Sequence, residues 1–184
     1  MERAVVGEGK KDGQTTSSRY ATHDGVRAMR RTKLVPISIK LVFLAAMLPA
    51  CGTGDVPYEI PATVQGYIVD YGFPVRGYGP AYLLTSTQFM MNDLSHTAQV
   101  TGPSEVTLDY SFLYLPPTRQ ARMVFHELVH RAQIEDLGYV GFCIEYAAQA
   151  VHAGTYGNMK HGGLEGEAYW LAQIYRNILE ASIR

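Results

Sequence analysis

The stretch Met123-Val124-Phe125-His126-Glu127-Leu128-Val129-His130-Arg131-Ala132-Gln133 decides how we interpret the sequence around it. Pro116-Pro117-Thr118 precedes this stretch and Gly138 follows it, a combination typical of the start and the end of a helix. We therefore predict a helix over residues 118–137. Its apolar residues form one face at helical spacing: Ala121, Phe125, Leu128 and Ala132. The opposite face carries Arg122, His126, His130 and Gln133.

The two histidines of this helix are four residues apart, so their imidazoles project to the same side. His126 and His130 can then each offer a nitrogen to one zinc ion. Glu127 lies beside such a metal, where its carboxylate can take a proton from zinc-bound water, whose pKa falls to roughly 7. This His-Glu-x-x-His arrangement is the motif of zinc metallopeptidases.

A surface helix with two solvated histidines and a glutamate is the alternative interpretation. The neighbouring residues Val124, Phe125, Leu128 and Val129 are apolar, which indicates a buried helix. Burying two imidazoles and a carboxylate without partners would cost several kcal/mol. A bound metal removes that cost, so we predict a zinc site.

A catalytic zinc needs a third protein ligand. A metzincin-type site would need glycine at position 133 and histidine at position 136, where Gln133 and Asp136 stand. Asp136 lies too far along the helix to reach the metal. The remaining candidates are Glu145, His152, His161, Glu165 and Glu167.

The segment Leu164-Glu165-Gly166-Glu167-Ala168-Tyr169 resembles the Glu-x-x-Ala segment that supplies the third ligand in gluzincin families. Glu165 and Glu167 are ~200° apart on a helix, so only one of them can face the metal. Matching Ala168 to the alanine of that segment selects Glu165. Glu167 and His161 stay open as alternatives.

Residues 105–176 together resemble the small DUF4157-type zinc metallopeptidase domains. The segments 126–133 and 164–169 carry this resemblance most specifically, whereas His161-Gly162-Gly163 departs from the usual Asn-Pro. The resemblance implies a zincin-like fold in which a strand over Glu105–Leu115 edges the cleft and binds an extended peptide by strand addition. It also implies that Gln133 contacts the metal ligands without itself binding the metal.

The part of the chain before the motif is rich in strand-forming residues, with strands predicted over residues 62–70, 81–90 and 105–115 and a loop over 92–104. Further helices are predicted over Val140–Ala153 and Leu164–Ser182, with a loop at 157–163 between them. The buried stripe of the last helix is expected to be Leu164, Ala168, Leu171, Tyr175 and Ile178. The fold class is therefore α+β, a small sheet followed by three helices.

The N-terminal segment has the features of a secretory signal. Basic residues precede the uncharged apolar run 41–50, and Leu48-Pro49-Ala50-Cys51 resembles the bacterial lipobox. We predict a signal peptide over 29–50, a lipidated Cys51 with a tether over 51–60, and the metallopeptidase domain over 61–184. Residues 1–28 are then a disordered extension or a misassigned start. The protein would be lipid-anchored in the bacterial cell envelope, outside the cytoplasm, with the membrane as one partner.

The charge distribution excludes one class of partner. Residues 1–40 hold nine of the 16 Lys/Arg residues and four of the 17 Asp/Glu residues, so the remainder is acidic and a poor ligand for nucleic acid. Two function hypotheses remain. The first is hydrolysis of a peptide or protein substrate by zinc-activated water, with Glu127 as general base. The second is a non-catalytic lipoprotein module stabilised by zinc, which would not require Glu127.

Overall fold

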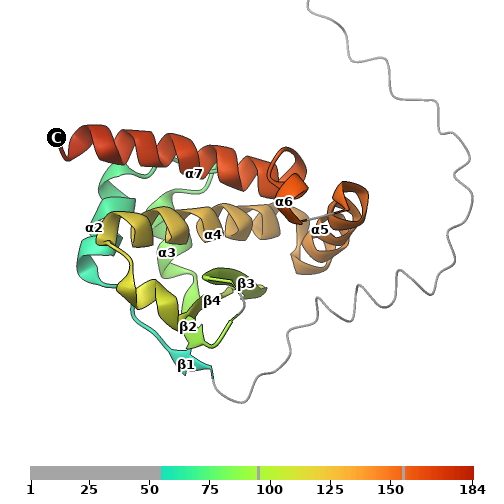
Figure 1. The fold of residues 1–184 in the computed structure, drawn as a ribbon, viewed down its shortest axis with the longest axis horizontal. Coiled ribbons are helices and arrows are strands. Elements are labelled where there is room, and N and C mark those ends of the chain that lie inside the picture. Colours follow the sequence, from blue (N-terminus) through green and yellow to red (C-terminus); the bar gives the residue numbers. More distant parts are fainter. Residues whose placement is uncertain (1–54, 95, 155) are drawn as a thin grey trace, which may run out of the picture. The chain divides into compact units, whose positions relative to one another are not determined.

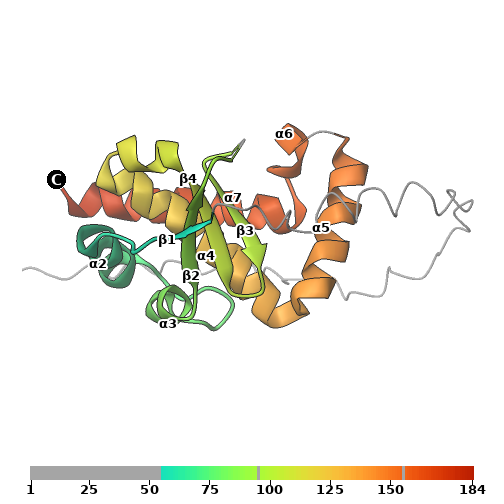
Figure 2. The same cartoon turned by 90° about the horizontal axis from the view of Figure 1, so that it is seen from below.

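Helix α4 (Pro117–Leu137) lies between a β-sheet on one side and helix α7 (Gly163–Ser182) on the other (Figures 1 and 2). The computed structural model describes residues 55–94, 96–154 and 156–184, and these belong to one unit of the chain. Helix α4 begins after Pro116 and ends at Gly138, whose φ of 69° favours glycine, so the helix predicted over 118–137 is confirmed. Elements pack against both sides of α4, which buries its polar residues His130 and Gln133 together with its apolar ones.

The sheet has four strands in the order β1-β2-β4-β3. They are β1 (Val56–Pro57), β2 (Gln88–Asn92), β3 (Ala98–Gly102) and β4 (Glu105–Asp109). Strands β2 and β4 are parallel, and the other two pairs are antiparallel. Strand β3 therefore forms an edge of the sheet, and it packs against α4.

Two predictions about these strands were wrong. The strand predicted over Glu105–Leu115 ends at Asp109, because the Asp109 carboxylate accepts a hydrogen bond from the Ser111 N–H (2.8 Å) and starts the 3-10 helix η1 (Tyr110–Tyr114). The expected loop 92–104 contains strand β3. The strand that edges the site is therefore β3, whereas β4 lies inside the sheet.

The N-terminal part of the domain is helical where strands were predicted. Residues 62–70 belong to helix α2 (Ala62–Tyr71), and residues 81–90 are divided between helix α3 (Pro80–Thr85) and strand β2. The core-facing residues of α2 follow the i, i+3, i+4, i+7 spacing of a helix: Val64, Tyr67, Ile68 and Tyr71. Their β-branched and aromatic character favoured a strand, but packing against α4 overrides that local preference.

The C-terminal helices agree more closely with the sequence. Helix α5 (Tyr139–Ala153) ends at Gly154 in a left-handed conformation, and α7 follows the short helix α6 (Tyr156–Met159), which occupies the start of the expected loop. In α7 the predicted stripe is correct at Leu164, Ala168 and Tyr175, but Ile178 is 38% exposed and Leu179 is buried instead. The domain combines helices with a small sheet, which confirms the α+β class, although two helices precede most of the sheet.

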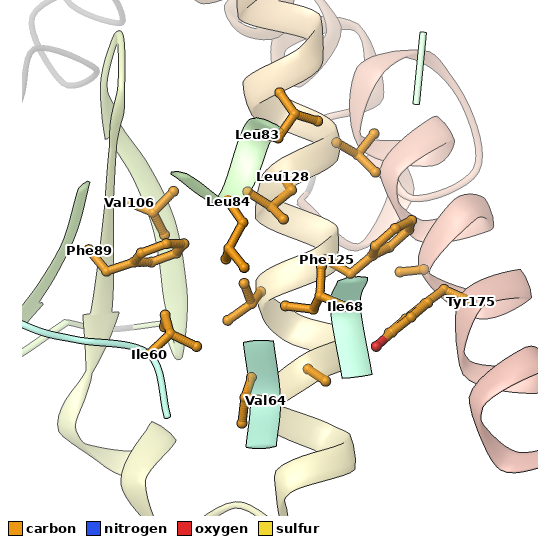
Figure 3. Close-up of a cluster of buried hydrophobic side chains, with 14 of the residues drawn as sticks. Ile60, Val64, Ile68, Leu83, Leu84, Phe89, Val106, Phe125, Leu128 and Tyr175 are labelled. Atoms are coloured by element: carbon orange, nitrogen blue, oxygen red, sulfur yellow. The ribbon is translucent and has the colours of Figure 1, made fainter. Parts of the chain in front are cut away.

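The main hydrophobic core lies between the sheet, α2, α4 and α7 (Figure 3). Phe89 and Val106 enter it from the sheet, and Leu128 enters it from α4. Phe125 of α4 stacks on Tyr175 of α7 with ring centroids 4.4 Å apart. This stacking contributes to the packing of α4 against α7.

Residues 55–60 were predicted to be part of a tether, and the structure packs them against the domain instead. Val56 pairs with Met91, and Ile60 is 3% exposed within the core. The predicted extension, signal peptide and lipidated Cys51 lie outside the described residues. Within the described part of the chain, no helix is both long enough and apolar enough to cross a membrane.

This packing generates a prediction about stability. We expect Ile60→Ala in the full-length chain to lower the free energy of unfolding by about 2–4 kcal/mol, because it leaves a cavity in the core. Val56→Ala, four residues earlier and 52% exposed, should change it by less than about 0.5 kcal/mol. Urea unfolding followed by circular dichroism measures both, and an equal, small effect would show that residues 55–60 do not belong to the domain.

Candidate metal centre

His126, His130 and Glu165 converge at the face of α4 that packs against the start of α7. The Nε2 atom of His126 lies 3.4 Å from Oε1 of Glu165, and Nε2 of His130 lies 3.1 Å from Oε2 of the same carboxylate. The two imidazole rings are nearly perpendicular, with an interplanar angle of 86°. One ligand atom from each of the three residues lies within 4.8 Å of the others.

These distances fit a single metal ion bound by all three groups. Two ligands about 2.05 Å from a tetrahedral zinc ion are about 3.3 Å apart, which the two nitrogen–oxygen distances bracket. Two imidazoles and one carboxylate are also a ligand set found in catalytic zinc sites. The group His126–His130–Glu165 could therefore hold a metal ion.

The electrostatics show why the buried carboxylate is compatible with this position. Burial alone would raise the pKa of Glu165, but hydrogen bonds from His126 and His130 outweigh it and hold that pKa well below its usual range. Burial alone would lower the pKa of His130, but the contacts with Glu165, Glu127 and Gln133 outweigh it and raise that pKa. Without a metal, positive charge on His130 thus compensates Glu165.

Glu127 lies beside these three residues and is itself only 5% exposed. Burial raises the pKa of the Glu127 carboxyl, and the opposing effects of His126, His130 and a backbone hydrogen bond from Val100 do not outweigh it. A carboxylate with a raised pKa is a stronger proton acceptor. Glu127 is therefore a buried carboxyl with a raised pKa beside the three converging residues.

Gln133 sets which nitrogen of His130 is available. Its Nε2 donates to the carbonyl oxygen of Leu164 and to Glu167, both at 2.9 Å, so its Oε1 must face Nδ1 of His130, at 2.8 Å. An amide oxygen is only an acceptor, so Nδ1 of His130 carries the proton. When the His130 ring is neutral, this leaves the lone pair on Nε2, the atom that faces Glu165 and the candidate metal position.

Arg76 extends this chain of contacts to the surface. Its guanidinium forms a two-point ion pair with Glu167 (2.7 and 3.2 Å) and a further bond to Asp136 (2.9 Å). Arg76 belongs to a tight turn, where its own φ is 47°. Because the carboxylate that orients Gln133 is held by Arg76, the order of contacts is Arg76, Glu167, Gln133 and His130.

Helix α5 supplies residues that the sequence analysis missed. Tyr146 donates a hydrogen bond to Oε2 of Glu165 (3.1 Å), and Phe142 packs edge-on to the His130 ring. Together with Tyr139 and Cys143 they line a cavity of about 160 Å³ that reaches His126, Glu127 and His130. Phe142 and Tyr146 are four residues apart on a helix, a spacing that could have indicated a shared face. Cys143 is half-buried in this wall.

The other residues considered as third ligand lie elsewhere. Glu145, His152 and His161 are exposed, and Glu167 faces Arg76 and Gln133. Asp136 is also engaged by Arg76, at the end of α4. Among the described residues, Glu165 is the carboxylate that the fold brings to both histidines.

Comparisons with known proteins add no assignment: no family model matches the chain, and neither a curated protein nor a solved structure is significantly similar to it. The resemblance to DUF4157-type domains stays a prediction from the sequence.

The geometry predicts different roles for the two glutamates of α7. Glu165→Ala removes a ligand and should lower zinc affinity more than 100-fold, whereas Glu167→Ala removes only the support of Gln133 and should lower it about 10-fold. Glu145→Ala, at an exposed position on α5, is the matched control and should leave affinity unchanged. Competition with a chromogenic chelator measures all three affinities, and a larger loss in Glu167→Ala would refute the assignment.

Proposed function

We propose that this domain is a zinc-dependent hydrolase of peptide bonds, with His126, His130 and Glu165 as zinc ligands and a zincin-like architecture. The observation that supports it most is the position of Glu127. A carboxylate with a raised pKa lies next to the three converging ligands, at the boundary of a cavity. A site that only stabilised the fold would have no use for such a base.

Zinc is the proposed metal because the ligand set combines two imidazoles with one carboxylate and leaves room for a water molecule. The same set also suits iron(II), which oxygenases use. The neighbouring Glu127 favours hydrolysis, because a group that accepts a proton from water is what a hydrolytic step needs.

The residues of the chain would divide the reaction among them. Zinc bound at this site would supply Lewis-acid activation of water near neutral pH. Glu127 accepts the proton of the attacking water and returns it to the nitrogen of the broken peptide bond. Gln133 keeps His130 in the tautomer whose Nε2 faces the site.

Strand β3 supports a peptide substrate. The N–H of Asp109 bonds to the carbonyl of Thr97, so alternation along the antiparallel pair directs the backbone groups of Ala98 and Val100 away from β4. Ala98 and Val100 also line the cavity at Glu127. Because Glu127 takes the N–H of Val100, we infer that an extended peptide pairs with this edge at Ala98, a role first assigned to residues 105–115.

The metal and the chemistry can be tested together in the full-length chain. Purified protein should contain one zinc ion, His130→Ala should lose it, and Glu127→Gln should keep it. Hydrolysis of casein should fall by 10²-fold or more in Glu127→Gln, because the general base is lost. Glu145→Gln is the control and should behave as wild type.

The outcomes separate the proposals. Zinc retained without measurable hydrolysis would favour the non-catalytic module over the peptidase. Iron in place of zinc, or no metal at all, would contradict the metal assignment.

We also propose that the protein is anchored in the bacterial cell envelope through Cys51. Basic residues, an apolar run and a lipobox-like segment follow one another over residues 30–51, and this order supports the proposal. In a bacterial host, the protein should fractionate with membranes, and Cys51→Ala should release it into the soluble fraction, as immunoblotting would show. Membrane association that survives this substitution would argue against lipidation.

A further inference from the structure

A second and larger cavity opens from the candidate metal centre. Its volume is about 560 Å³, and its lining includes His126, Glu127 and Ala98, so it is continuous with the site. From there it extends along the N-terminal half of α4 and the C-terminal half of α7. Because Phe125 meets Tyr175 and His130 meets Glu165, these two helices run antiparallel and form the floor of a groove.

Three arginines line the part of the groove beyond the metal centre: Arg119, Arg122 and Arg176. They are three of the seven Lys/Arg residues that follow residue 40, although that part of the chain is acidic. Arg119, Arg122 and His126 have the i, i+3, i+7 spacing that places residues on one helix face. The positive charges therefore lie along the groove, in the part that extends away from His126.

The charges of these arginines are only partly compensated. Arg176 forms an ion pair with Glu180 at 2.6 Å, whereas neither Arg119 nor Arg122 forms a salt bridge with any described residue. The hydrogen bond from Arg176, and then the charges of Arg176, Arg184 and Arg122, lower the pKa of Glu180. The single carboxylate at this end is thus outnumbered by cations.

The walls of the groove suit a peptide chain. Leu115, Met123 and Leu179 contribute apolar surface, and Tyr169, edge-on to His126, lines the same groove. A cleft that combines apolar walls with a few charged groups is typical of a binding site for a specific ligand.

We propose that this groove is a substrate subsite for carboxylates, which gives the enzyme a preference for acidic peptides. The proposal rests on the proposed function in one respect: it takes the reacting bond to be a peptide bond. At 1.5 Å per residue, Arg122 and Arg119 lie about 6 and 10 Å before His126 along α4. An extended peptide advances about 3.4 Å per residue, so the recognised carboxylate lies about two to three residues from the bond at the metal centre.

The carboxylate could belong to an aspartate or glutamate side chain or to the C-terminus of the peptide. An internal acidic residue and a free C-terminus present the same chemistry to Arg119 and Arg122, and peptides of matched composition distinguish them. Both arginines can form two-point hydrogen bonds with either one.

The test measures binding to the metal-free full-length protein, so that no peptide is cleaved. The probes are fluorescein-labelled decapeptides of alanine and serine with a C-terminal amide and a central Glu-Glu or Gln-Gln pair, and the Gln-Gln peptide with a free C-terminus. Fluorescence anisotropy should show about five- to tenfold tighter binding of at least one carboxylate-bearing peptide than of the Gln-Gln amide. The difference should shrink at 0.5 M salt.

Variants then assign the preference to the groove. The double variant Arg119→Gln/Arg122→Gln should lose it, and Arg119→Lys/Arg122→Lys, which conserves charge, should keep most of it. Lys160→Gln removes an exposed charge outside the groove lining and is the control. Thermal unfolding close to that of wild type would show that the variants fold.

Equal binding of all peptides, no measurable binding, or a preference that survives in the double Gln variant would overturn the proposal. Because the protein is metal-free, these results do not depend on zinc or on hydrolysis. A carboxylate preference in a protein that cleaves no peptide would leave the groove assigned and would reject the peptidase.

Discussion

The structure depends on how one buried carboxylate is compensated. Glu165 is 1% exposed, at the start of a helix that packs along α4, and the nitrogens that face it belong to His126 and His130. Without positive charge between them, such a carboxylate would destabilise the contact between α4 and α7. A protonated His130 or a bound cation can provide that charge. The packing of α4 against α7 and the chemistry of the site therefore both depend on the charge that compensates Glu165.

Hydrogen bonds connect His130 to residues farther from the site. Gln133 has two acceptors for its amide nitrogen, and these determine what its oxygen offers to His130. Glu167, one of the acceptors, is held by Arg76 from a turn about 90 residues away in sequence. A surface ion pair of this kind contributes little to stability by itself. Its importance here is geometric, because through Glu167 and Gln133 it reduces the number of orientations open to His130.

The helix that carries His126 and His130 also borders the neighbouring cavity and strand. The N-terminal half of α4 forms the floor of the arginine-lined groove, and strand β3 lies across the other side of Glu127. The arginines of the groove, Ala98 of β3 and Glu127 therefore border one continuous cavity. Rigid elements position all three, which favours a preorganised site.

The sequence by itself determined the elements whose signals are local. Helix α4 followed from Pro117, Gly138 and apolar spacing, and the convergence of His126 with His130 followed from helical periodicity. The α+β class and the position of helix α7 were also predictable.

Only the tertiary structure decided the rest, because it depends on residues far apart in the chain. Val64 and Ile68 have strand propensity but became helical through packing on α4. Strand β3 exists because β4 pairs with it. Glu165 reaches the histidines, and Glu167 does not, because the packing of α7 against α4 sets its rotation. The contacts from Arg76 and Tyr146 join separate elements, which no local pattern records.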